Sequence, residues 1–209
     1  MLYDLTQVIR PQMPVYPGTE SPSLQPACTL ERDGYRETML CLSSHTGTHM
    51  DAPAHILPGG LTLDKLDISR FCGTAAVIDC QGRRIITAEL LDGIDEPVDF
   101  LLFHTCWDRF WGDESYIDGF PVLDEAAAHR CTKLCKKGIG VDAISVDLPD
   151  SELLPNHYTL LEAGLVIVEN LRNLTPLVGQ RIRFAALPLL YAGADGAPVR
   201  AMGEALEDA

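Results

Sequence analysis

Three histidines and one aspartate lie close together in segment 45–55 of the chain. They are His45, His49, Asp51 and His55. Imidazole and carboxylate groups are the usual protein ligands of zinc and manganese. A divalent cation held by them can lower the pKa of water and polarise a carbonyl group, which is the chemistry of hydrolysis. Because half of the chain's six histidines fall in this segment, it favours a metal site over a polar loop with scattered histidines.

The backbone of the segment must bend if His45 and His49 are to bind one ion. A helix would place both rings on one face, but Gly47 disfavours a helix by about 1 kcal/mol relative to alanine. Residues 38–44 favour a strand, and in an ideal strand the two rings would lie about 13 Å apart, at about 3.3 Å per residue. Bonds of about 2.0–2.1 Å from each nitrogen cannot span that distance. We therefore expect a bend at Gly47, where a strand passes into a loop and off regular structure.

A second group of candidate ligands lies far along the sequence. His157 follows Pro155-Asn156 near an expected helix start, and Glu169 ends the apolar run 165–168. A charge next to a buried strand needs a partner, which a metal ion would supply. Spacing alone leaves a helix-capping histidine and a salt-bridged glutamate as the alternative. We expect His104 to be structural and His129 to be solvated.

Apolar runs and turn residues predict an α/β fold in a single domain that spans residues 1–209. The clearest helix is expected at 124–137, with Asp124 as its N-cap and Gly138 ending it. A short helix is expected to end at Gly164. The Pro-rich residues 10–26 predict an ordered, extended loop. Strands are expected at 74–79, 98–103, 139–146, 165–168 and 181–187.

The composition narrows the possible partners. The chain has 209 residues, 46% of them hydrophobic, and a formal net charge of −14 without a cluster of basic residues. This charge disfavours binding to nucleic acid or to an anionic membrane. No apolar run approaches the roughly 20 residues of a membrane span. The sequence begins without a signal-peptide pattern, so we expect a cytoplasmic protein whose seven cysteines are reduced.

Segment 45–55 has the form His-x-Gly-Thr-His-x-Asp-x-Pro-x-His. This pattern resembles the signature of the metal-dependent cyclase-like hydrolases, a family that includes bacterial kynurenine formamidase and isatin hydrolase. The resemblance covers almost the whole chain. The other segments that carry it are 3–6, 14–18, 140–147 and 168–171.

The resemblance implies a swivelling β/β/α fold with mixed sheets and flanking helices. It also implies two divalent ions held by His45, His49, Asp51, His157 and Glu169. Three histidines with two carboxylates suit zinc, although manganese and iron tolerate the same ligands. Asp51 and Glu169 would bridge the ions, and His55 would donate and accept protons. Members of the family act on small molecules and form homo-oligomers, so we expect a dimer or a tetramer.

Two departures from the family pattern leave the substrate open. Tyr16 stands where kynurenine formamidases carry a tryptophan in the substrate pocket, although a tyrosine can still stack on an aryl ring. His104 and Cys106 stand where relatives often carry arginine and glycine. Neither departure touches the predicted metal ligands.

We therefore predict a metal-dependent amidohydrolase of the arylformamidase type, acting on an aromatic amide such as N-formylkynurenine. One alternative is a hydrolase of cyclic amides, of the isatin type. A second is a metal-dependent cyclase or dehydratase acting on a carbonyl compound. A non-enzymatic metal-binding protein is the third.

Overall fold

The computed structural model describes residues 1–206, which contain the helices α1 (Leu30–Asp33), α2 (Glu125–Leu134) and α3 (Pro155–Glu162). The strands in this part of the chain are β1 (Leu2–Asp4), β2 (Ser23–Cys28), β3 (Glu37–Cys41), β4 (His49–Asp51), β5 (Cys72–Asp79), β6 (Ile85–Ile86), β7 (Val98–His104), β8 (Val122–Leu123), β9 (Cys135–Val141), β10 (Val166–Glu169), β11 (Arg181–Pro188) and β12 (Gly196–Ala205). Short 3-10 helices connect several of them, including η1 (Pro53–His55). No helix within residues 1–206 is long and apolar enough to cross a membrane.

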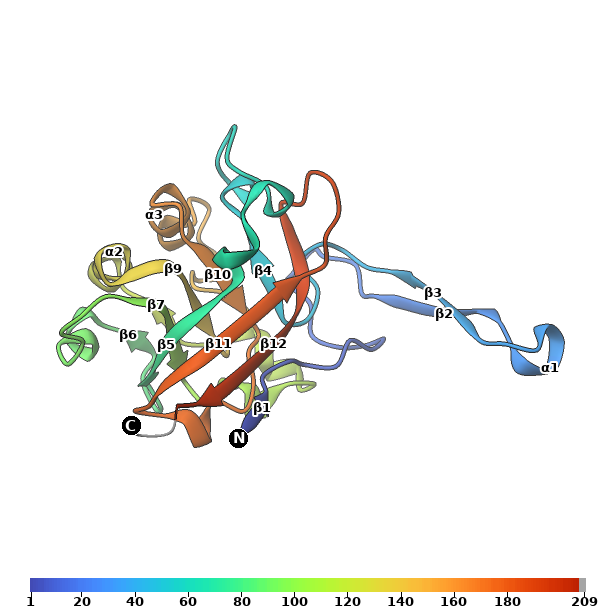
Figure 1. Ribbon diagram of the computed structural model, residues 1–209, viewed down its shortest axis with the longest axis horizontal. Helices are drawn as coiled ribbons and strands as arrows, with labels where there is room; N and C mark the ends of the chain where they lie inside the picture. The colour runs from blue at the N-terminus through green and yellow to red at the C-terminus, as the bar shows by residue number, and fades with distance from the viewer. Residues whose placement is uncertain (207–209) are drawn as a thin grey trace.

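Among the described residues, seven strands close into a barrel in the order β12–β11–β5–β7–β9–β10–β4 (Figure 1). The barrel closes because β4 pairs with both β10 and β12. The pairings from β5 through β7 and β9 to β10 are parallel, and the remaining ones are antiparallel. Strand β1 adds to the far end of β12. The closure holds the short strand β4, which carries two predicted ligands, between two partners.

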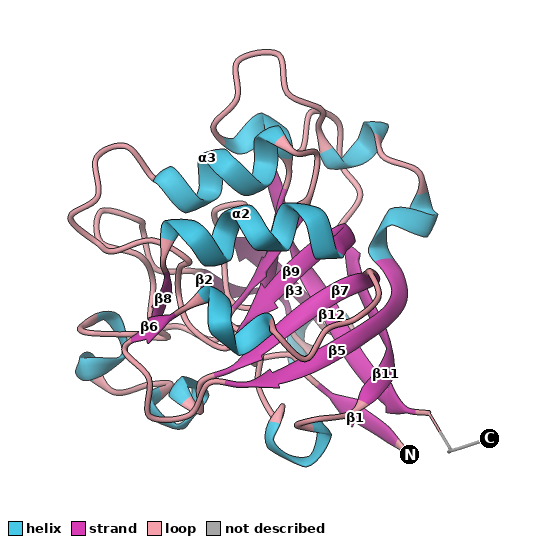
Figure 2. Ribbon diagram, turned by 90° about the vertical axis from the view of Figure 1, so that its left-hand side faces the viewer, coloured by secondary structure: helices cyan, strands magenta, loops and turns pink. Residues whose placement is uncertain are grey.

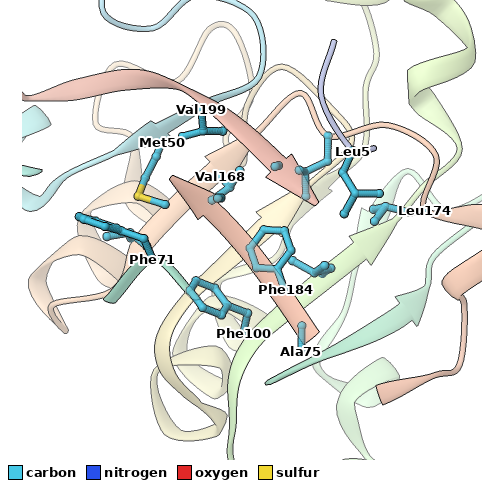
Figure 3. Packing of buried hydrophobic residues seen from close by; sticks show 14 of the residues in the cluster. Leu5, Met50, Phe71, Ala75, Phe100, Val168, Leu174, Phe184 and Val199 are labelled. Carbon is cyan, nitrogen blue, oxygen red and sulfur yellow. The ribbon is translucent and has the colours of Figure 1, made fainter. Parts of the chain in front are cut away.

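Strands β7 and β10 are buried on both faces, which explains their uninterrupted apolar runs, whereas β11 alternates buried and exposed residues. Alternate side chains of a strand point to opposite faces, so Phe100 and Leu102 of β7 both belong to the inner core. Figure 3 shows Phe100 in this core. Leu101 and Phe103 face outward and belong to a second cluster with buried residues of α2 and α3. These two helices lie side by side against the strands (Figure 2). In the inner core the ring centroids of Phe100 and Phe184 lie 5.1 Å apart. Burying each such side chain stabilises the fold by about 1.5–3 kcal/mol.

The structure confirms the predicted α/β class. The runs expected at 74–79, 98–103 and 181–187 lie in barrel strands, and the run expected at 165–168 corresponds to β10, which starts one residue later, at Val166. The strand expected at 139–146 begins earlier, at Cys135, and ends at Val141. The sequence did not predict β12 because Gly196, Pro198 and Gly203 interrupt its apolar pattern. Without β12 there was no indication that the sheet closes.

Helix α2 ends earlier than predicted. Asp124 is its N-cap, as expected, and accepts a hydrogen bond from the backbone N–H of Ala127 at 2.7 Å. The helix stops at Leu134, however, and Gly138 lies inside β9. A Cβ at Gly138 would overlap the carbonyl oxygen of Val166 on β10. Close packing of strands therefore requires this glycine, which is not a helix cap.

Strands β2 and β3 form an antiparallel hairpin that extends away from the barrel and carries α1 at its tip (Figure 1). We call it the arm (residues 23–41). The strand predicted at 38–44 corresponds to β3, which ends at Cys41. The extended loop predicted at 10–26 gives way to β2 at Ser23. A hairpin outside the main sheet tolerates Pro26 within a strand because few ladder hydrogen bonds depend on it.

Candidate metal centre

The predicted bend is present at Gly47, whose φ of 66° lies in the left-handed region that glycine favours. His45 precedes the bend, and η1 ends at His55. The expectation that the candidate ligands lie off regular structure is wrong for His49 and Asp51, because both lie on β4. Residues two apart on a strand point to the same side, so a strand can direct both side chains into one site.

Two later elements bring the distant candidates to β4. Strand β10 pairs antiparallel with β4, and Glu169 lies directly opposite His49. His157 comes from the first turn of α3. The structure thus brings together residues that spacing alone could not join.

Asp51 and Glu169 each present their two oxygens to different histidines. Oδ1 of Asp51 lies 2.7 Å from Nδ1 of His45 and 3.3 Å from Nε2 of His49. Its Oδ2 lies 3.6 Å from Nε2 of His157. Oε2 of Glu169 lies 3.4 Å from Nε2 of His49, and Oε1 lies 3.4 Å from Nε2 of His157. Each carboxylate therefore lies between histidines that come from different elements.

The two carboxylates are buried side by side and need positive charge. Asp51 is 1% exposed and Glu169 is 4% exposed. Burial would raise the pKa of Asp51, but hydrogen bonds with three histidines outweigh it and hold the pKa well below its usual range. Burial and the neighbouring Asp51 raise the pKa of Glu169. Its Oε1 is buried and has no hydrogen-bond partner among the described residues.

Each of the three histidines also has an outer acceptor that orients its ring, as metal-binding histidines usually do. The pairs are Nδ1 of His49 with the carbonyl oxygen of Gly47 at 2.9 Å, Nδ1 of His157 with Oδ2 of Asp147 at 2.7 Å, and Nε2 of His45 with Oδ2 of Asp195 at 3.0 Å. Burial would lower the pKa of His45, but the bonds to Asp51 and Asp195 raise it to about 9.

Sequence reasoning missed Asp147 and Asp195. Asp147 directly follows the strand expected at 139–146, so the argument that singled out Glu169, a charge at the end of an apolar run, could also have found it. Asp195 lies 150 residues from His45 and carries no local signal.

His55 lies beside the cluster. Its ring centroid is 4.0 Å from that of His45 and 5.9 Å from that of His157. Burial lowers the pKa of His55 to about 4, so its imidazole is neutral near pH 7 and can accept a proton. Ligand atoms of His45, Asp51 and His55 also lie within 4.8 Å of one another, as do those of His49, Asp51 and Glu169. The division of ligands between ions, and the role of His55, stay predictions.

A cavity of about 250 Å³ opens onto this cluster. Tyr16, from the Pro-rich loop, lines it together with Ile144 and Leu154. The hydroxyl of Tyr16 donates to the carbonyl oxygen of Pro149 at 3.3 Å, which ties the loop to the segment that precedes α3. The cavity therefore combines an apolar wall with a polar floor, as ligand sites usually do.

The remaining histidines have surroundings that fit the predicted structural and solvated roles. His104 is buried and lies within hydrogen-bond distance of Asp79 and Thr175. His129 lies on the exposed face of α2, 3.8 Å from Glu125 one turn earlier. Cys106 has a φ of 62°, a conformation that favours glycine, which accounts for the glycine of the family pattern at this position.

Comparison with known proteins places the chain in a family. The model of the cyclase family matches residues 3–148. The chain belongs to this family. A cyclase-family relative, the kynurenine formamidase of Salinibacter ruber, is 33% identical over 207 residues, which cover 96% of each chain.

Solved structures share the cyclase-family fold over nearly the whole chain. Isatin hydrolase A from Labrenzia aggregata, bound to benzyl benzoate, is 24% identical, with a TM-score of 0.89 over 99% of this chain and 94% of that one. A protein described as a potential metal-dependent hydrolase with cyclase activity is 29% identical, with a TM-score of 0.83 over 100% of this chain and 99% of that one. The expected family resemblance and fold are thus confirmed.

Proposed function

We propose that this cyclase-family protein is a metal-dependent hydrolase that cleaves the C–N bond of an aryl formamide such as N-formylkynurenine. The observation that carries the proposal is the buried group of imidazoles and carboxylates at the floor of a cavity, in a chain whose full-length relatives are named kynurenine formamidase. The apolar wall formed by Tyr16 suits an aromatic substrate.

The residues fit divalent cations. Among the described residues Glu169 Oε1 is a buried oxygen without a hydrogen-bond partner, although Nε2 of His157 lies 3.4 Å away, and it stands beside a second buried carboxylate, so added positive charge would be favourable here. We propose that two ions, zinc or alternatively manganese, bind here, with the ligands His45, His49, Asp51, His157 and Glu169. When bound, they would supply the positive charge that lowers the pKa of water and polarises the substrate carbonyl.

His55 would move the proton in this reaction. Its burial keeps the imidazole neutral, so it can accept a proton from the water that attacks the formyl carbon. The C–N bond then breaks, and His55 returns the proton to the leaving nitrogen. The products are formate and an aryl amine, which balances the addition of one water.

We propose in addition that the protein acts as a homo-oligomer in the cytoplasm. Met39 and Leu40 on the arm are 62% and 57% exposed, so the arm offers apolar surface to a second copy. All seven cysteines are free, in keeping with a reducing compartment. Sedimentation velocity of the purified protein tests the assembly, because a monomer at all concentrations would contradict it.

The decisive assay compares substrates and metal states. The purified protein should hydrolyse N-formylkynurenine, lose this activity on thorough chelation, and regain it with Zn²⁺ or Mn²⁺. Activity that survives demetallation would refute the metal role. Hydrolysis of isatin alone would favour the cyclic amide reaction, and turnover of non-amide carbonyl compounds alone would favour a cyclase or dehydratase.

A further inference from the structure

Asp147 is a buried carboxylate that makes three hydrogen bonds at the start of α3. It is 2% exposed. Its Oδ1 accepts the backbone N–H of Asn156 at 3.0 Å. Its Oδ2 accepts the backbone N–H of His157 at 2.9 Å and Nδ1–H of the same residue at 2.7 Å. One carboxylate therefore holds both the backbone and the ring of His157.

Helix α3 needs this carboxylate because its own N-cap residue cannot serve. Leu154 occupies the N-cap position with a φ of 43° and has no side chain that accepts a hydrogen bond. The first N–H groups of a helix require acceptors, and a negative charge there is favourable to the helix dipole. Asp147, which precedes Asn156 by nine residues, supplies both the acceptor and the negative charge.

The same contact fixes which nitrogen of His157 faces the candidate metal centre. In the neutral imidazole that a metal requires, a ring that donates Nδ1–H to a carboxylate keeps its lone pair on Nε2. That nitrogen lies 3.6 Å from Oδ2 of Asp51 and 3.4 Å from Oε1 of Glu169. Asn156 holds the turn in place by donating from Nδ2 to the carbonyl oxygens of Leu123 and Val146 at 2.8 and 2.9 Å.

We propose that Asp147 is a positioning residue for the metal centre: it holds His157 in the tautomer and orientation that bind a cation, and couples this ligand to the start of α3. The proposal rests on the proposed function only in taking His157 as a metal ligand. Asp147 would act through His157, without contact to the cation or the substrate.

The test compares Asp147→Asn with Asp124→Asn. Asp124 caps the neighbouring helix α2 through the N–H of Ala127, so its variant removes the negative charge of a helix cap without touching an imidazole. We would measure the Zn²⁺ affinity of each demetallated protein by competition with a chromophoric chelator. Loss of such an outer partner lowers metal affinity by about 10- to 100-fold, and we expect this for Asp147→Asn alone. Unchanged affinity in Asp147→Asn, or an equal loss in both variants, would overturn the proposal.

A second pair of variants tests whether Asp147 acts through His157. In the background of His157→Ala, adding Asp147→Asn should weaken Zn²⁺ binding no further, since the ring to be oriented is gone. If Asp147→Asn lowered the Zn²⁺ affinity of His157→Ala by the same factor as that of the wild type, Asp147 would act independently of His157 and the proposal would be refuted.

If Asp147→Asn does not fold, the wild-type protein still provides a test. In the zinc-loaded protein labelled with ¹⁵N-histidine, NMR should show His157 protonated at Nδ1, with its resonance assigned through His157→Gln. Protonation at Nε2 would overturn the proposal. An assay on N-formylkynurenine separates the two hypotheses: a protein that binds Zn²⁺ through an oriented His157 but hydrolyses no formamide refutes the proposed function and leaves this inference standing.

Discussion

His55 and the metal ligands are neighbours in space, so the proton-transfer role must be separated from a ligand role. Its ring lies 4.0 Å from that of His45, and its neutral imidazole suits a proton acceptor. We predict that His55→Ala lowers kcat/KM for N-formylkynurenine by about 10²- to 10⁴-fold while the bound zinc, measured by elemental analysis, stays unchanged. His129→Ala, on the exposed face of α2, is the matched control and should keep full activity. Loss of zinc in His55→Ala would make His55 a ligand.

The backbone of Cys106 adopts a conformation that glycine would adopt at lower energy. Its φ of 62° is left-handed, which destabilises a residue with a Cβ by about 1–2 kcal/mol. Its backbone N–H donates to Oδ2 of Asp142 at 2.8 Å, a bond that glycine also makes. We therefore predict that Cys106→Gly raises the free energy of unfolding by about 1 kcal/mol, measured by urea denaturation. Cys106→Ser keeps the Cβ and should show no such gain, and a Cys106→Gly variant less stable than wild type would contradict the argument.

At the scale of elements, the sequence predicted those features that depend on residues close together in the chain. The density of ligands in 45–55 and the conformational freedom of Gly47 are properties of adjacent residues, so the cluster and the bend could be predicted. Glu169 could be singled out because a charge abuts a buried run. The end of α2 could not, since Gly138 is set by Val166 of a neighbouring strand.

The bend at Gly47 gives the element-scale prediction. A Cβ at Gly47 would lie 3.2 Å from Cγ1 of Ile9, and its φ of 66° disfavours any side chain. The carbonyl oxygen of Gly47 accepts from His49 and from Nδ2 of Asn170, at 2.9 and 2.8 Å. We expect Gly47→Ala to lose about 1–2 kcal/mol of stability and also to bind Zn²⁺ more weakly, because the displaced carbonyl no longer orients His49.

Gly59→Ala is the control for this effect. Gly59 has a φ of 77°, yet no atom lies within 4 Å of a Cβ built there. Its variant should therefore suffer the backbone strain alone and keep the wild-type Zn²⁺ affinity. Chelator competition on both proteins decides the matter: equal affinities would show that the bend does not position the ligands.

At the scale of the whole molecule, closure of the barrel depends on both ends of the chain. Strand β12 pairs with β4 at its start and with β1 at its end, so residues near both termini complete one sheet. This arrangement supports the single domain that we propose. Neither the closure nor the outer partner Asp195 could be predicted, because both join segments more than a hundred residues apart.

The cooperativity of this closed fold can be measured through its thiols. Cys80 is 1% exposed, and burial raises the pKa of its thiol to about 12 from an ordinary value of 9.0, whereas Cys72 is exposed. At pH 8 the folded protein holds almost no thiolate at Cys80, so alkylation must wait for unfolding. With a free energy of unfolding of at least about 5 kcal/mol, Cys80 should react about a thousandfold or more slowly than Cys72.

The raised pKa of the Cys80 thiol also makes the free energy of unfolding depend on pH. Above pH 9 the unfolded chain loses a thiol proton that folded Cys80 retains up to about pH 12, so stability falls as the pH rises through this range.

Peptide mass spectrometry of iodoacetamide-treated protein, native and in urea, measures the alkylation rates of Cys80 and Cys72 at each pH. If Cys80 were alkylated as fast as Cys72 in the native protein, the layer between the barrel and its helices would open locally, and the barrel would not unfold as one unit.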